Sequence, residues 1–299
     1  MVLPPGIDSF LRSSCPTFVA IMKRLFIGLA VASGLLTIAG CGDGSQHDNT
    51  SSANASASTT AVPNISFSVI KSYPHDTGSF TQGLTIYKGQ LYEGTGGAEY
   101  DMVGNRFSKL MRVDLETGKA EKSIDLDPQY FGEGIAILND TLYQLTWREH
   151  KVFVYTLPDF KKVKEFPLNT EGWGITTDGK DLIVSDGTSN LYFYNPSNFQ
   201  LLHTQSVTQN GDLSYNLNEL EYIDGYVYAN QWQEPNIFKI DPANGLIVGR
   251  IDVTTLWERI RQIDPQADVP NGIAYNADTQ QIYFTGKKWP ELYEVKLGQ

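Results

Sequence analysis

A glutamate between two glycines is the residue in this sequence best suited to transfer protons. Glu133 lies in Gly132-Glu133-Gly134, where the small neighbours leave room for a ligand to approach closely. A carboxylate in such a place can take a proton from one atom of a substrate and return it to another, which is typically worth about 10² to 10⁴ in rate. The alternative is structural, with Glu133 accepting hydrogen bonds from backbone amides at a tight corner.

Other residues suited to a small amide or cationic ligand occur at similar places. Lys287 and the side-chain amides of Asn218 and Gln82 can donate hydrogen bonds to an oxyanion developing on a carbonyl group. Aromatic rings can enclose a compact substrate and attract its amine while that amine is protonated. The candidate rings are Phe80, Phe131, Trp147, Trp173 and Trp232. Core packing is the alternative for each ring, and a solvated rim charge is the alternative for Lys287.

Other polar residues are assigned to structure. We expect the carboxylates of Asp186 and Glu219 to bond loop backbone. The histidines lack the spacing of metal ligands, so the sequence predicts no catalytic zinc and no cofactor. They are His47, His75, His150 and His203.

A repeated pattern of short strands must position the candidate residues. Each repeat has a Gly-rich or acidic corner with an apolar strand, a turn, a second strand and a third. A spacing of about 40 to 50 residues, with about four short strands per unit, is typical of a β-propeller. Because the innermost strands of a propeller converge on its central channel, we expect the corners to face one mouth. The corners begin at Phe80, Phe131, Glu171, Asn218 and Asn271.

The two ends of the repeat region complement each other. The fifth unit reaches Gln299 just after its third strand, and the segment 65–73 precedes the first unit without a partner. We therefore predict an all-β fold, a five-bladed β-propeller closed by pairing of the N-terminal strand with the last blade. A β-sandwich with a similar number of strands is the alternative. One helix is expected at 253–262, with Thr254 or Thr255 near its start.

The N-terminal region indicates export. Lys23 and Arg24 precede the apolar stretch 25–32, and Ile38-Ala39-Gly40-Cys41 resembles the lipobox of bacterial lipoproteins. We predict a signal peptide over 1–41 with its true start at Met22, lipidation at Cys41, a flexible tether over 42–63 and the propeller over 64–299. A membrane anchor that is not cleaved is the alternative. Gly42 after Cys41 favours the outer membrane of a two-membrane organism, with the propeller facing the periplasm.

Charge and cysteine content restrict the partners. The formal net charge of −11, without clustered Lys and Arg beyond the N-terminus, argues against nucleic acid as a partner. Once the leader is removed, Cys41 is the one remaining cysteine, so no disulfide framework is expected. We expect a monomer that touches the membrane through its lipid anchor only.

Eight motifs in series resemble those of the papaya-type glutaminyl cyclases of plants and bacteria. The similarity runs in order from about Phe67 to the end of the chain. The motifs are SFTQGL (79–84), FGEG (131–134), GWG (172–174), SDGT (185–188), LNELEY (217–222), NQWQ (230–233), NGIA (271–274) and TGKKWP (285–290).

This resemblance implies a five-bladed propeller that converts the N-terminal glutamine of peptides or proteins to pyroglutamate and releases ammonia, without a metal. It implies that Glu133 is the acid–base residue. The pocket residues that it implies are Phe80, Gln82, Phe131, Trp147, Trp173, Asn218, Trp232 and Lys287. The chain departs from the plant pattern at 96–106, which is longer, and in the doubled Lys287-Lys288, so the resemblance does not select one lysine.

Two other functions remain open from the residues themselves. A metal-dependent propeller lactonase or hydrolase would hold its metal with Glu133, Asn218 and Asn271. A lipid-anchored propeller that binds a peptide without reacting with it would use the same mouth. Release of ammonia from a glutamine-initiated dipeptide distinguishes cyclisation from both.

Overall fold

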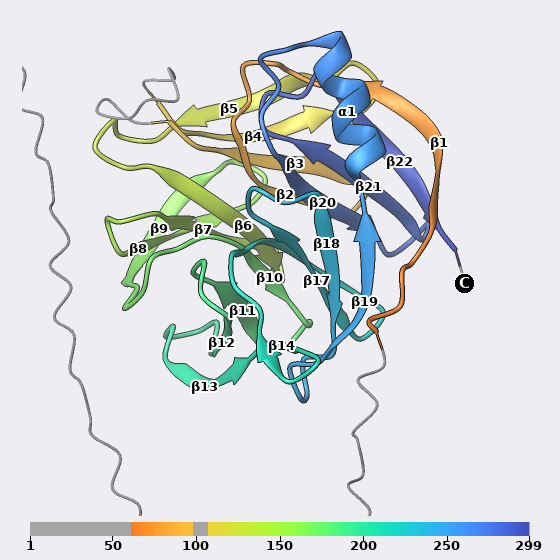
Figure 1. The fold of residues 1–299 in the computed structure, drawn as a ribbon. Helices are drawn as coiled ribbons and strands as arrows, with labels where there is room; N and C mark the ends of the chain where they lie inside the picture. The colour runs from red at the N-terminus through yellow and green to blue at the C-terminus, as the bar shows by residue number, and fades with distance from the viewer. Residues whose placement is uncertain (1–60, 98–106, 299) are drawn as a thin grey trace, which may run out of the picture. The chain divides into compact units, whose positions relative to one another are not determined.

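Residues 61–97 and 107–298, which the computed structural model describes, form five four-stranded sheets arranged as the blades of a propeller (Figure 1). The first strands of neighbouring sheets contact one another and line the centre. The predicted five-bladed, all-β fold is confirmed. The predicted leader, Cys41, the tether up to residue 60 and the segment 98–106 lie outside the described residues.

In the first four blades the strands run in chain order from the centre outward, and neighbouring strands are antiparallel. The first two blades consist of β2 (Thr81–Tyr87), β3 (Gln90–Thr95), β4 (Lys109–Asp114) and β5 (Lys119–Asp125), then β6 (Gly132–Leu138), β7 (Thr141–Thr146), β8 (Lys151–Thr156) and β9 (Lys161–Pro167). The next two consist of β10 (Ile175–Thr177), β11 (Leu182–Ser185), β12 (Asn190–Tyr194) and β13 (Leu201–Ser206), then β16 (Leu217–Ile223), β17 (Tyr226–Gln231), β18 (Asn236–Ile240) and β19 (Ile247–Asp252).

The last blade confirms the predicted closure of the ring. It contains β20 (Pro270–Asn276), β21 (Gln281–Gly286) and β22 (Glu291–Leu297), and its outer strand is β1 (Phe67–Pro74) from the start of the propeller. β1 pairs antiparallel with β22, from Phe67 opposite Leu297 to Pro74 opposite Glu291. This pairing satisfies the backbone edge that β22 would otherwise expose.

Apolar side chains fill the space between neighbouring blades. Tyr92 and Leu110 of the first blade pack with Ile135 and Phe153 of the second in one buried cluster. Inner strands such as β6 are buried along nearly their whole length, whereas outer strands such as β9 are largely exposed. The near-continuous apolar inner strands therefore reflect burial on both faces.

Glycines at the corners let the inner strands approach each other. A Cβ on Gly83 would lie 2.4 Å from the backbone nitrogen of Ile135, and one on Gly134 would lie 2.7 Å from the carbonyl oxygen of Trp173. The Gly134 amide in turn donates a hydrogen bond to that carbonyl at 2.8 Å. The expectation that the glycines around Glu133 leave room for a ligand is thus wrong for Gly134, because the next blade fills that space.

Helix α1 (Thr254–Ile263) connects the fourth and fifth blades, close to its predicted position. Its first turn is stabilised by Asp252, whose Oδ1 accepts hydrogen bonds from the amide of Thr254 at 2.9 Å and its hydroxyl at 2.5 Å. Leu256 and Ile260 bury one face of the helix against the core. Among the described residues, no helix is long and apolar enough to cross a membrane.

A buried histidine joins the closing strand to the first and fifth blades. His75 directly follows β1, and its Nδ1 lies 2.7 Å from the carbonyl oxygen of Trp289. Its Nε2 lies 3.1 Å from Oε1 of Glu93, which also accepts a hydrogen bond from the hydroxyl of Thr81. Burial lowers the pKa of His75, but the Glu93 carboxylate and the Trp289 carbonyl outweigh burial, so the net shift is upward.

We expect His75→Gln to lower the melting temperature more at about pH 5 than at about pH 9. A raised folded-state pKa means that the contribution of the cation is complete below the unfolded value of about 6.5 and is lost as pH rises through the folded value. At low pH the lost buried pair costs about 3 kcal/mol of unfolding free energy. Thermal melts across this pH range measure the difference, and an equal deficit at every pH would contradict the ionised pair.

Candidate active site

The corners of the blades gather the predicted site residues at one end of the propeller. Each inner strand begins at this end and each second strand finishes there, because neighbouring strands are antiparallel. The residues placed at this end are Phe80, Gln82, Phe131, Glu133, Trp147, Trp173, Asn218, Trp232 and Lys287.

Five aromatic side chains form an arc along this end. Phe80 and Phe131 meet edge to face with ring centroids 6.4 Å apart, and Phe131 meets Trp147 in the same way at 5.6 Å. Trp173 and Trp232 form a second edge-to-face pair at 5.4 Å. Phe131 is buried, whereas the other four rings are partly exposed. The arc therefore offers ring surface to a compact ligand.

Glu171, which was not predicted to be a site residue, connects the two groups of rings. Its Oε2 accepts hydrogen bonds from the indole nitrogen of Trp147 at 2.9 Å and from that of Trp173 at 3.1 Å. Its Oε1 accepts one from Nε of Arg148 at 3.2 Å. Burial raises the pKa of Glu171, but these hydrogen bonds together outweigh burial and lower it. The local signal for this role is its position two residues before Trp173, at a blade corner.

We expect Glu171→Ala to lower kcat/KM by about 10- to 100-fold, mainly through KM, because two indole N–H groups lose a charged acceptor. The Glu171→Gln variant keeps one acceptor oxygen but removes the negative charge. Because that charge raises the pKa of Glu133, its removal lowers the pKa of Glu133. Its acid limb in the kcat/KM profile should therefore move to lower pH. Glu165→Ala, on the outer strand β9 of the second blade, is the control. A Glu171→Gln profile that does not move would remove this electrostatic link.

Glu133 is buried, but its carboxylate does not bond to the backbone of the described residues. The residue is 5% exposed, and its Oε1 accepts a hydrogen bond from Nε2 of Gln82 at 3.2 Å. No backbone amide of the described residues donates to it. Glu219, on the fourth blade, is the contrast: its two oxygens accept the amides of Leu84 at 3.2 Å and Ile273 at 2.8 Å. Glu219 thus ties three blades together, as expected for a structural carboxylate, whereas Glu133 has no such role.

Burial and neighbouring charges set the protonation of Glu133. Burial raises its pKa well above the ordinary value, Glu149 and Glu171 raise it further, and Lys287 acts in the opposite direction. The pKa of Lys287 is lowered by burial, against the opposing effect of Glu133 and Asp268. A carboxyl with a raised pKa binds protons more readily than a solvated one, which suits an acid–base group.

The structure distinguishes the two adjacent lysines. Lys287 is 4% exposed, and its Nζ lies 4.6 Å from the centroid of the Phe80 ring. Lys288 is half-buried with a φ of 59°, and its Nζ lies 6.0 Å from the same centroid. Lys287 is also the lysine whose charge acts on Glu133. It is therefore the better candidate for the site.

A short series of side-chain amides orients Glu133. Asn271 Nδ2 donates to the carbonyl of Thr81 at 2.9 Å and to Oε1 of Gln82 at 3.4 Å. This arrangement directs Nε2 of Gln82 at Glu133, so Gln82 is placed to orient the carboxylate. Oδ1 of Asn271 and Oδ1 of Asn218 are both buried without a hydrogen-bond partner in the described part of the chain. These two oxygens can accept hydrogen bonds from the donors of a ligand.

Asp186 is the other carboxylate that the sequence assigned to structure. Asp186 accepts hydrogen bonds from the amide and hydroxyl of Thr188 and from the hydroxyl of Tyr192, so it organises its own loop as expected. Within residues 61–97 and 107–298, no three His, Cys, Asp or Glu side chains are grouped to hold a metal ion.

Comparison with known proteins agrees with this arrangement. The sequence profile of the glutamine cyclotransferase family matches residues 45–297. A glutaminyl-peptide cyclotransferase from Arabidopsis thaliana is 41% identical over 235 residues, which cover 77% of this chain and 71% of that protein. The crystal structure of Myxococcus xanthus glutaminyl cyclase superposes with a TM-score of 0.72 at 34% identity, covering 80% of this chain and 98% of that one. The chain therefore belongs to the glutamine cyclotransferase family.

Proposed function

We propose that this protein converts the N-terminal glutamine of peptides or proteins to pyroglutamate and releases ammonia. The observation that carries the proposal is the buried carboxylate of Glu133, which accepts no hydrogen bond from a backbone amide of the described residues. It lies at the aromatic end of the propeller in a member of the glutamine cyclotransferase family. Family membership favours this reaction over the hydrolase and the peptide-binding alternatives.

The reaction joins the α-nitrogen of glutamine to its own γ-carboxamide carbon, and the bond from that carbon to the amide nitrogen breaks. Because both groups belong to one residue, their proximity supplies much of the rate that an intermolecular reaction would lack. The attacking amine has an ordinary pKa of about 8 and must be neutral to attack, while the departing nitrogen must gain a proton. Glu133 takes the proton from the first nitrogen and gives it to the second.

Charge that develops on the γ-oxygen requires hydrogen-bond donors. Lys287 is buried and electrostatically coupled to Glu133, and its ammonium group is the strongest donor among the predicted residues. Asn218 contributes through its side-chain amide, with its unpartnered oxygen accepting from a substrate N–H. The indoles of Trp147 and Trp173, held by Glu171, confine the substrate by shape.

Ammonia release tests the proposal. The purified propeller is incubated with a glutamine-initiated dipeptide, and we expect ammonia together with a product lighter by one ammonia molecule. The same dipeptide with an acetylated α-amine, which lacks the nucleophile, is the matched control and should yield neither. Binding of the free dipeptide without ammonia release would support the non-enzymatic module instead.

We expect activity to survive exhaustive treatment with EDTA or phenanthroline, because the proposed steps use only protein side chains. Ammonia release is measured before treatment, after it and after addition of zinc or calcium. Loss of activity that a metal restores would favour the metal-dependent alternative, in which Asn218 and Asn271 present their unpartnered oxygens to a cation.

We further propose that the protein is an exported, monomeric lipoprotein attached through Cys41. The support is the lipobox-like Ile38-Ala39-Gly40-Cys41 after a basic and apolar leader. A Cys41→Ser variant should move from the membrane fraction to the soluble fraction.

A further inference from the structure

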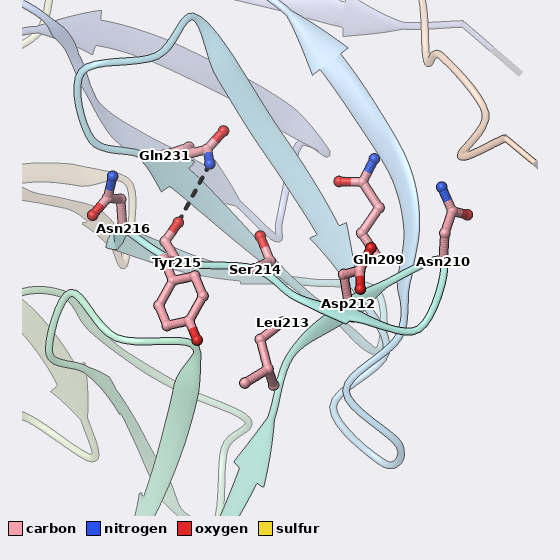
Figure 2. A pocket seen from close by; sticks show the side chains of 8 residues that line it. All are labelled: Gln209, Asn210, Asp212, Leu213, Ser214, Tyr215, Asn216 and Gln231. Carbon is pink, nitrogen blue, oxygen red and sulfur yellow. Dashed lines mark hydrogen bonds between the residues drawn. The ribbon is translucent and has the colours of Figure 1, made fainter. Parts of the chain in front are cut away.

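A depression of about 410 Å³ lies beside the aromatic arc, between the third and fourth blades. The hairpin formed by β14 (Thr208–Gln209) and β15 (Asp212–Leu213) builds one side, and the segment leading into β16 builds another. Figure 2 shows Tyr215, Asn216 and Gln231 at one end and Gln209 and Asn210 at the other. The lining residues are Gln209, Asn210, Asp212, Leu213, Ser214, Tyr215, Asn216 and Gln231.

One end of this depression adjoins the candidate active site through Asn216. The carbonyl of Asn216 accepts a hydrogen bond from the backbone amide of Trp232 at 2.8 Å, and its own amide donates to the carbonyl of Gly187 at 3.0 Å. A Cβ on Gly187 would lie 2.6 Å from the ring of Trp173, so Gly187 packs directly on that indole. Asn216 therefore connects the depression to the backbone of Trp232 and, through Gly187, to the indole of Trp173.

The depression is preformed. The amide of Ser214 donates a hydrogen bond to the carbonyl of Val207 at 3.0 Å. The amide of Val207 donates one to the carbonyl of Ser189 at 2.6 Å. Gln231 is held from both sides, because its Nε2 donates to the carbonyl of Tyr215 and its Oε1 accepts from Nδ2 of Asn236. A ligand thus finds the hairpin already in place.

The lining has the chemistry to bind a peptide chain. Asn and Gln side chains each carry a donor and an acceptor, which complement backbone N–H and C=O groups of any sequence. Leu213 and Tyr215 are 48% and 55% exposed, so they can cover apolar side chains of a ligand. Asp212 is exposed and adds a negative charge that favours a basic side chain.

We propose that this depression binds the residues that follow the N-terminal glutamine in a peptide substrate. The inference rests on the proposed function, since the glutamine itself must occupy the arc. A chain that leaves the Trp173–Trp232 pair meets Asn216 first and then Tyr215 and the hairpin. A dipeptide is too short to gain much from these contacts.

Steady-state kinetics with two substrates test the proposal. For the unaltered protein, we expect kcat/KM to be about tenfold higher for a glutamine-initiated octapeptide than for a glutamine-initiated dipeptide. The double variant Leu213→Ser/Tyr215→Ala should lose this advantage through a higher KM for the octapeptide. Leu201→Ser, which alters an equally exposed leucine (49%) on β13, is the control.

The outcomes separate the two proposals. If the unaltered protein turns over neither peptide, the proposed function fails. If it turns over both peptides equally well, or if the double variant lowers kcat/KM for both peptides to the same extent, the subsite is wrong while the function stands. Asp212→Lys provides a second readout: it should reverse a preference for lysine over glutamate at the third position of the octapeptide, and an unchanged preference would contradict the role of Asp212.

Discussion

Replacing Glu133 by glutamine is expected to lower kcat for glutamine-initiated peptides by about 10² to 10⁴, the usual contribution of a positioned acid–base group. The variant keeps an oxygen that can accept the hydrogen bond from Gln82, so the side chain retains its neighbour. It cannot carry a proton from the attacking nitrogen to the departing one. Ammonia release under saturating substrate, with circular dichroism of the same sample, measures chemistry and fold together.

Glu219→Gln is the matched control, because Glu219 is also a buried glutamate on an inner strand of the propeller. Its two oxygens accept the backbone amides of Leu84 and Ile273, and glutamine can replace only one of these acceptors. We expect this variant to melt at a lower temperature. A Glu133→Gln variant that retains kcat, or that loses stability as Glu219→Gln does, would assign Glu133 to structure.

Replacing Lys287 by methionine is expected to lower kcat by about 10² to 10³, the size of effect found when a donor to a developing oxyanion is removed. A second effect has a predictable sign. Because the Lys287 cation lowers the pKa of Glu133, its removal lets that pKa rise further. The fraction of ionised Glu133 then falls at a given pH, and the acid limb of the kcat/KM profile moves to higher pH.

This shift is opposite to the one expected for Glu171→Gln, so the pair of variants tests the charge arrangement rather than the fold. Lys288→Met is the control for Lys287→Met, since Lys288 is farther from Phe80 and less buried than Lys287. Equal losses in the two lysine variants would contradict the choice of Lys287. A Lys287→Met profile that moves to lower pH would contradict the coupling itself.

Some features missed from the sequence depend on contacts between distant segments. Glu171 accepts hydrogen bonds from the indole N–H groups of two blades. The residues next to it in the chain do not show that Trp147 comes within hydrogen-bond distance. The hairpin of β14 and β15 was missed because each strand has two residues, too few for a periodic pattern. The hydrogen bonds that Asp252 accepts from Thr254 at the start of α1 were also missed, since the sequence indicated only a threonine near that start.

The sequence by itself determined the architecture and the set of candidate residues. Blade number, ring closure and the corners follow from local patterns that repeat, because each blade must bury two faces with the same short strands. Only the tertiary structure decided what each polar side chain does. Glu133 and Glu219 are both glutamates at corners, and Lys287 and Lys288 are adjacent, but burial, neighbouring charge and available backbone amides differ at each position. Those quantities arise from blades brought together in space, so no single segment encodes them.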